Sequence, residues 1–215
     1  LWSVTGSLPI PLRRNMVVYR LADGSLLLHS VIAMNDAGME QLDRLGKPSI
    51  MIVPHGTHRM DAPFYKARYP QVRVVCPAAV RTKVQEVIHV DATAEEALPA
   101  LGVRLHHLPG YKHGELAYDV DIPGGRALML GDAVANRDYA PGLLGSFLAN
   151  TSGGIKGRLG VARIVRLMLV KNKTGARADL TRLSEIPDLK VLALAHGRHL
   201  VDDCAQALRE AAAAF

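Results

Sequence analysis

The stretch "IVPHGTHRMDAPF", residues 52–64, follows an apolar run and carries His55, His58 and Asp61 at three-residue intervals. Imidazole and carboxylate groups are ligand types that zinc, iron and manganese accept. Taken alone, the stretch is either the start of a metal site or a polar loop whose histidines bond to backbone groups. Asp61 has a further alternative, because an aspartate before Ala62-Pro63 is an ordinary signal for capping the first turn of a helix.

Composition limits the classes of protein to consider. The chain has 215 residues, 49% of them hydrophobic, which predicts one well-packed domain over residues 1–215. Two cysteines predict no disulfide framework and favour the reducing cytoplasm. No run approaches the roughly 18 to 20 apolar residues of a membrane span. The net charge of +6 and pI of about 9.5 allow an anionic small-molecule substrate, whereas 5% aromatic residues disfavour nucleic acid.

Apolar runs separated by turn signals predict a mixed α/β fold. Residues 15–32 predict a hairpin with a two-residue turn at Asp23-Gly24, and residues 35–46 predict a helix that starts at Asn35 or Asp36 and ends at Gly46. Further strands are expected at 48–54, 72–77, 103–109, 115–123, 126–132 and 189–197, and helices at 62–70, 78–88, 200–215 and, with glycine breaks, 141–182. This order indicates a mixed sheet covered by helices.

The candidate polar side chains share one position, directly after a strand. His55 and His58 follow the strand at 48–54, His113 lies in the turn after 103–109, and Asp132 and His196 follow two later strands. Because the carboxyl ends of neighbouring strands meet at one edge of a sheet, we expect these side chains to converge. Asp132 and His196 have the alternative of being ordinary turn residues beside a glycine.

In their order and spacing these segments resemble the metallo-β-lactamase fold superfamily over nearly the whole chain. The segments are "NMVVYRLADGSLLL", "IMIVPHGTHRMD", "HHLPGYKHGE", "ALMLGDAV" and "LALAHG". The first loop is also similar to that of a divergent branch whose loop begins with proline. The resemblance implies a four-layer αββα sandwich with metal ions at one edge, which activate water to attack an ester, amide or phosphoester.

Three departures from the family pattern imply a degenerate metal site. Working members have His-x-His-x-Asp-His in the first loop, whereas here two residues separate His55 from His58 and Ala62 replaces the last histidine. In the Pro-Gly-His turn Tyr111 stands in place of the ligand, and neutral tyrosine is a poor ligand at pH 7. His113 lies two residues further on and replaces it only if the turn is rebuilt.

The resemblance therefore implies one ion at most, zinc, iron or manganese, or none. The candidate ligands are His55, His58, Asp61, His113, Asp132 and His196. Asp132 and His196 match the family's "GD" and late histidine, and Asp61 and Asp132 are the candidate catalytic residues, with Asp61 as a general base. Tyr111 and Arg137 are candidate substrate contacts. Two functions stay open: an ester or phosphoester hydrolase, and a metal-free, non-catalytic member that binds a ligand or protein partner.

Residues 153–173, "GGIKGRLGVARIVRLMLVKNK", predict a basic helix. One interpretation is a covering helix with a solvated basic face. Another is a lid or contact surface for an anionic substrate or an acidic membrane, and a third is a homo-oligomer contact.

Overall fold

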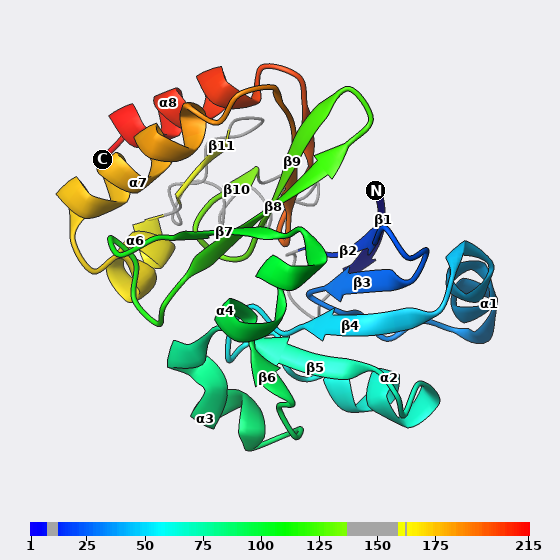
Figure 1. The fold of residues 1–215 in the computed structure, drawn as a ribbon. Coiled ribbons are helices and arrows are strands. Elements are labelled where there is room, and N and C mark those ends of the chain that lie inside the picture. The colour runs from blue at the N-terminus through cyan, green and yellow to red at the C-terminus, as the bar shows by residue number, and fades with distance from the viewer. Residues whose placement is uncertain (8–12, 137–158, 162) are drawn as a thin grey trace, which may run out of the picture. The chain divides into compact units, whose positions relative to one another are not determined.

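The computed structural model describes residues 1–7, 13–136, 159–161 and 163–215 (Figure 1). They form two compact units. The first contains Leu1–Val4 and Asn15–Val103, and the second contains Thr5–Arg14 and Arg104–Phe215. Each unit has its own apolar core. That residues 1–215 form a single domain stays a prediction.

The first unit is built on a six-stranded mixed sheet with the order β1-β2-β3-β4-β5-β6. The strands are β1 (Trp2–Ser7), β2 (Arg13–Arg20), β3 (Leu26–His29), β4 (Pro48–Ile52), β5 (Arg73–Cys76) and β6 (Ala92–Thr93). β2 and β3 are antiparallel, whereas β3 to β6 run parallel. The sequence predicted β2 to β5 but missed β1 and the two-residue β6.

The loop between β2 and β3 is longer than the predicted two-residue turn. The N–H of Leu21 donates to the carbonyl of Ser25 at 2.8 Å, so the loop comprises residues 22–24. Gly24 has a φ of +83°, which glycine adopts without a steric penalty. The Oδ1 of Asp23 accepts the N–H of Ser25 at 2.9 Å. The prediction of a hairpin is right, and the prediction of its turn length is wrong.

Helices of the first unit start and end at local signals. They are α1 (Asp36–Leu45), α2 (Ala62–Arg68), α3 (Arg81–Gln85) and α4 (Ala94–Ala97), with 3₁₀ turns η1 (Ala78–Val80) and η2 (Pro99–Leu101). The Asn35 side chain accepts the N–H of Gly38 at 3.0 Å, and Gly46 ends α1 with a φ of +150°. Thr93 and Glu96 form a reciprocal capping box at α4.

The core of the first unit packs these helices against the sheet. All four residues of β3 are buried, as expected for a strand covered on both faces. Met39 of α1, Tyr65 of α2 and Val84 of α3 belong to the same apolar cluster as Met51 of β4 and Val74 of β5. The first candidate loop leaves from the carboxyl end of β4, one of these packed strands.

The second unit has a five-stranded sheet with the order β13-β12-β9-β8-β7 and a separate pair, β10 and β11. The strands are β7 (Arg104–His107), β8 (Leu116–Ile122), β9 (Gly125–Leu130), β10 (Ala135–Asn136), β11 (Leu159–Gly160), β12 (Leu189–Leu194) and β13 (Leu200–Val201). β9 and β12 are parallel, and their last residues, Leu130 and Leu194, pair with each other. The residues that follow these two strands therefore leave the sheet side by side.

Two helices of the second unit, α7 (Lys173–Ser184) and α8 (Cys204–Ala213), lie side by side along its sheet (Figure 1). Leu180 of α7 and Leu208 of α8 pack with Leu128 of β9 and Leu192 of β12. The apolar residues by which β9 and β12 were predicted thus form the sheet side of this core.

The helix predicted over residues 200–215 starts later than expected. Leu200–Val201 forms β13, because these residues pair with β12. Asp202 and Asp203 then adopt φ values of +67° and +49°, a conformation that aspartate tolerates better than most residues, and the helix begins at Cys204.

The continuous basic helix predicted over residues 153–173 is wrong within the described residues. Leu159–Gly160 forms β11, and the helix described between β11 and α7 is α6 (Arg163–Leu169). The chain is extended at Val170, and Asn172 caps α7 by accepting the N–H of Gly175. Residues 153–158 lie outside the described residues.

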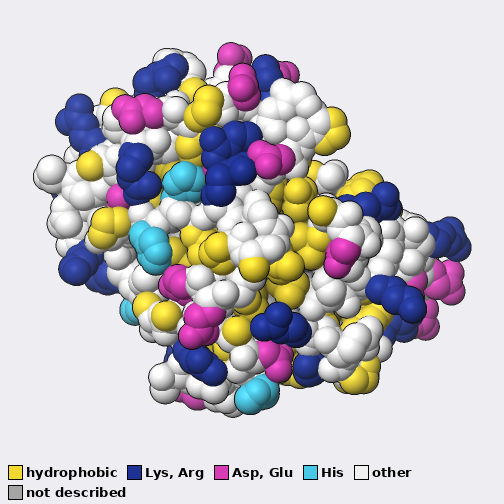
Figure 2. All heavy atoms as spheres, viewed as in Figure 1, with side chains coloured by type: hydrophobic (Ala, Val, Ile, Leu, Met, Phe, Trp, Pro, Cys, Tyr) yellow, Lys and Arg dark blue, Asp and Glu magenta, His cyan; other side chains and the backbone are white. Residues whose placement is uncertain are grey.

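No helix among the described residues is long and apolar enough to cross a membrane. Cys76 and Cys204 are buried free thiols, in agreement with the prediction from the sequence that the chain has no disulfide framework. On the face shown in Figure 2, lysine and arginine side chains are interspersed with acidic ones. On that face the basic residues therefore do not gather into the continuous stripe typical of nucleic-acid binding.

Candidate functional site

The first candidate loop follows β4 in the first unit. The N–H of His58 donates to the carbonyl of His55 at 2.9 Å, which closes a tight turn and explains the spacing of the two histidines. The Nδ1 of His55 accepts the N–H of Thr57 at 3.3 Å and lies 2.8 Å from its hydroxyl oxygen. Neutral His55 then carries its proton on Nε2, so this tautomer has no second lone pair to offer a metal.

His58 is held from the end of the neighbouring strand. Its Nδ1 lies 2.7 Å from the Oγ of Ser30, which follows β3, and both residues are buried. Ser30 adopts a φ of +58°, uncommon for a residue with a Cβ, and donates its N–H to Ile52 at 3.1 Å. When Nδ1 donates to the serine oxygen, the lone pair of His58 is on Nε2, the arrangement that metal-binding histidines require.

Asp61 lies at the end of the same loop, immediately before α2. Asp61 is the N-cap residue of α2, as one alternative predicted, but its side chain makes no capping hydrogen bond to the helix. Ala62, where the family pattern has a histidine, is fully buried in the core of the first unit. The methyl side chain of Ala62 offers no ligand atom, so this position contributes nothing to a metal site.

Asp132 and His196 meet in the second unit. Each lies two residues beyond the end of a strand, and those ends pair Leu130 with Leu194. The Nε2 of His196 is 3.1 Å from the Oδ1 of Asp132, and the two side chains are 13% and 15% exposed. The structure thus brings these two predicted residues together through the register of β9 and β12.

The hydrogen bonds of His196 limit the chemistry of this pair. Its Nδ1 lies 3.2 Å from the carbonyl oxygen of Arg13. A carbonyl only accepts, so Nδ1 carries a proton. Nε2 faces a carboxylate and therefore needs either a second proton or a shared cation, since two lone pairs repel. Metal-binding histidines commonly donate their other N–H to a backbone carbonyl in this way.

Glu115, just before β8, is a residue of the site that sequence reasoning missed. It is 4% exposed, and its Oε1 accepts the backbone N–H of Asp132 at 3.0 Å. Burial and the negative charge of Asp132 raise the pKa of Glu115 to about 8, although backbone hydrogen bonds from Asp132 and Ala133 oppose the rise. A single glutamate after a turn carries no signal, because its burial depends on the packing of distant strands.

The turn that carries Tyr111 is hydrogen-bonded to two later parts of the second unit, α7 and the extended residue Val170 before it. Gly110 donates its N–H to the Oδ2 of Asp179 at 2.8 Å, and Tyr111 pairs with Val170 in an antiparallel bridge. Tyr111 is 3% exposed, and burial raises the pKa of its phenol further above its ordinary value. The phenol therefore stays protonated and does not replace the missing histidine ligand.

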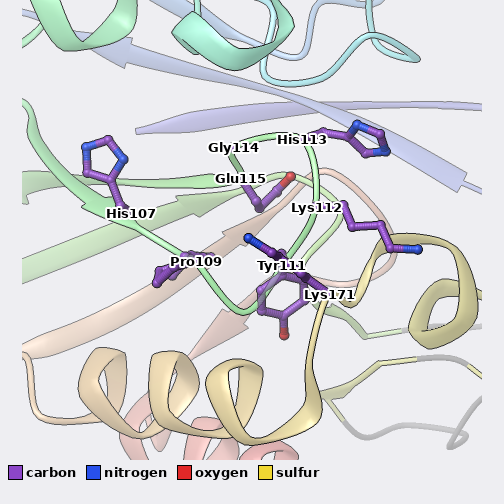
Figure 3. Close-up of a pocket in the computed structure, with 9 residues that line it drawn as sticks. His107, Pro109, Tyr111, Lys112, His113, Gly114, Glu115 and Lys171 are labelled. Carbon is purple, nitrogen blue, oxygen red and sulfur yellow. The ribbon is translucent and has the colours of Figure 1, made fainter.

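The same turn lines a pocket of about 490 Å³ in the second unit (Figure 3). The exposed lining is mainly apolar and comes from nine residues: His107, Leu108, Pro109, Tyr111, Lys112, His113, Gly114, Glu115 and Lys171. His113 is exposed, has a φ of +63° and extends away from the Tyr111 ring (Figure 3). One residue of the lining, Glu115, accepts the backbone N–H of Asp132, so the pocket borders the Asp132 site.

Three solved structures similar to the chain are metallo-β-lactamases. The metallo-β-lactamase from Erythrobacter litoralis aligns with a TM-score of 0.63 at 13% identity, over 100% of this chain and 92% of that one. The enzyme from Hirschia baltica gives 0.60 at 14% identity, over 98% and 91%. The B3 metallo-β-lactamase BLEG-1 gives 0.59 at 13% identity, over 93% and 94%. The chain has the metallo-β-lactamase fold. No family sequence profile and no curated protein sequence matches it.

The metallo-β-lactamase fold confirms the mixed α/β class predicted from the sequence, and identities this low show the fold alone. Within that fold the predicted residues fall into four groups. Asp132 and His196 lie together, His55, His58 and Asp61 share one loop of the first unit, Tyr111 and His113 line the pocket, and Arg137 lies outside the described residues.

Proposed function

We propose that the chain is a metal-dependent hydrolase with a reduced metallo-β-lactamase site that binds one divalent ion. The observation that carries this proposal is the pair of Asp132 and His196, 3.1 Å apart, with the far nitrogen of the imidazole bonded to a backbone carbonyl. His58 is the proposed third ligand, by the resemblance of its loop to the family's first ligand loop. Three protein ligands and one open position are the usual set of a catalytic zinc.

The donor set fits zinc, ferrous iron or manganese, which accept imidazole nitrogen and carboxylate oxygen. A bound divalent ion supplies Lewis-acid activation of water. The chain's own groups orient the ligands. The Arg13 carbonyl holds the ring of His196, the Ser30 hydroxyl holds the ring of His58, and the Glu115 carboxyl holds the backbone of Asp132.

The proposed substrate is a small anionic ester or phosphoester. Asp61, half-buried in the loop that carries His58, is the proposed general base that takes a proton from the attacking water. Tyr111, at the pocket, and Arg137 stay proposed substrate contacts. These roles come from the chemistry of the residues and the family resemblance.

The decisive experiment is metal analysis of the purified chain after incubation with zinc, manganese or ferrous iron and removal of free ion. We expect about one ion per chain, and Asp132→Ala and His196→Ala should each abolish it. His89→Ala, which alters an exposed histidine, is the matched control. A stoichiometry near zero with all three metals would reject the hydrolase. Hydrolysis of aryl esters and phosphodiesters should then appear only with the loaded wild-type chain.

A second candidate is a metal-free member of the fold that binds a ligand without catalysis. Two observations favour it: Ala62 and Tyr111 are buried at positions where working members have ligand histidines. In that case His196 is doubly protonated and forms an ion pair with Asp132. Metal analysis separates the two functions, because the imidazolium form repels a cation.

A further inference from the structure

The short helix α6 turns two apolar side chains outward. Leu167 is 80% exposed, the largest exposed fraction of any large apolar residue that the structure describes, and Met168 is 61% exposed. A surface helix ordinarily turns such side chains toward the core. Exposed apolar side chains that adjoin one another, unlike single ones, often mark a contact surface.

Contacts on the opposite side of α6 fix this orientation. The guanidinium group of Arg166 lies 4.8 Å from the ring centre of Phe215, and its Nε donates to the carbonyl of Val161 at 3.1 Å. Val170 donates its N–H to the carbonyl of Arg166 at 3.2 Å and is buried in the apolar core of the second unit. Residues four apart share one face of a helix, which leaves Leu167 and Met168 on the side turned to solvent.

A basic group adjoins this apolar pair. The N–H of Lys112 donates to the carbonyl of Leu169 at 2.7 Å, and its Nζ donates to the carbonyl of Leu167 at 3.3 Å, so the ammonium group lies beside α6. Residues 163–178 contain no aspartate or glutamate and five basic residues: Arg163, Arg166, Lys171, Lys173 and Arg177. Leu167, Met168 and Lys112, here called the α6 patch, therefore combine apolar surface with positive charge.

The chemistry of the α6 patch favours an anionic bilayer over a protein partner. Two apolar side chains are too few for a stable protein interface, which buries roughly 800 Å² on each partner. A bilayer needs no complementary shape, because apolar side chains enter its interface individually and nearby lysines attract anionic lipids. A second copy of the chain would bring the same positive charge to the contact, which disfavours pairing through this surface.

We propose that the α6 patch is a membrane-docking surface. Leu167 and Met168 enter the headgroup region of a bilayer, and Lys112 pairs with the phosphate groups of anionic lipids. Because Lys112 also lines the pocket, docking brings that pocket close to the bilayer surface. Docking depends neither on a metal nor on the proposed hydrolase function.

The test is flotation of the full chain with vesicles of phosphatidylcholine, and with vesicles that also contain phosphatidylserine, at low and physiological salt. We expect binding to the anionic vesicles, weaker at the higher salt. L167Q/M168Q should weaken it by roughly tenfold or more, because the buried apolar surface is lost. Lys112→Gln should weaken it by roughly fivefold. Glutamine favours helix nearly as well as leucine and methionine, so the exposed double variant should fold as the wild type does.

The matched control is Met60→Gln, which removes a comparably exposed methionine of the first unit and should leave vesicle binding unchanged. A polarity-sensitive fluorophore reports insertion directly. Its emission should shift to shorter wavelength on anionic vesicles when it is attached to L167C, and should stay unchanged on M60C. Labelling is selective because Cys76 and Cys204 are buried.

Equal binding by wild type and L167Q/M168Q, or no binding of wild type to anionic vesicles, would overturn the proposal. A dimer in light scattering that L167Q/M168Q converts to monomers, without vesicle binding by the wild type, would assign the α6 patch to a second copy and overturn it as well. Vesicle binding by a chain that takes up no metal would reject the hydrolase and leave membrane docking in place.

Discussion

The two candidate ligand regions are constructed by different physical means. In the first unit, His55 and His58 are neighbours because a tight turn joins them, and nearby hydroxyl groups orient their rings. In the second unit, Asp132 and His196 come from distant parts of the chain and meet because β9 and β12 pair in a fixed register. A local turn therefore sets the spacing of His55 and His58, and the Ser30 hydroxyl, from a different strand end, orients the ring of His58. Sheet register decides that Asp132 and His196 meet.

The largest expected effect tests how rigidly each region is held. Gly110→Ala places a Cβ against backbone, which cannot move away, and should lower the free energy of unfolding by about 3 kcal/mol or more. Gly56→Ala, in the first loop, brings a Cβ to 2.8 Å from the Cγ of Lys83, whose exposed side chain can change rotamer, and should cost about 1 to 2 kcal/mol, less than Gly110→Ala. Urea unfolding measures both. Similar losses in the two variants would contradict the difference in rigidity.

A pH effect should arise in the second unit, from Glu115. Its folded-state pKa of about 8 lies above the ordinary 4.5, so its stabilisation is fully present below pH 4.5 and is lost as the pH rises through 8. In chelator-treated protein, the contribution of Glu115 to the free energy of unfolding should fall by about 3 kcal/mol between pH 5 and 8. Urea unfolding across this range measures the fall.

Glu115→Gln should remove that pH dependence. Glu86→Gln should not, because Lys83 and Arg59 lower the pKa of the exposed Glu86 and its titration falls below this window. A pH profile that is the same in wild type and Glu115→Gln would show that Glu115 does not titrate as its burial predicts.

Metal affinity should separate the two regions directly. Asp132→Ala and His196→Ala should each weaken zinc binding by at least about 100-fold, because each removes a ligand atom. His55→Ala should change it by less than about threefold, since the Nδ1 of His55 accepts a backbone N–H. Competition with a chromophoric chelator measures all three. A loss in His55→Ala equal to that in His196→Ala would show that His55 is a ligand.

The smallest expected effect concerns the orientation of His58. Ser30→Gly removes the hydroxyl while suiting a φ of +58°, and should weaken zinc binding roughly tenfold. Thr57→Val removes the corresponding hydroxyl beside His55 and should leave zinc affinity unchanged. Imidazole nitrogen NMR reports the tautomers. If His58 keeps its proton on Nδ1 in the glycine variant, Ser30 does not set the tautomer.

Most strands were predictable because each is an apolar run bounded by turn residues, which is a local signal. β2 to β5, β7 to β9 and β12 all follow this rule. The errors lie where pairing with a distant segment overrides local preference. Leu200–Val201 is a strand because β12 lies beside it, and the basic segment is interrupted at Val170 because that residue pairs with Tyr111.

By itself the sequence determined the mixed α/β class, the strands that end in polar residues, and the two substitutions, Ala62 and Tyr111, that weaken the family's ligand set. Residue type and short-range periodicity are sufficient for those conclusions. Only the tertiary structure decided that Asp132 faces His196, that the buried Glu115 accepts the N–H of Asp132 and that Ser30 holds His58. Hydrogen bonding and burial at those atoms depend on groups that are distant along the chain, and no local pattern of residues specifies them.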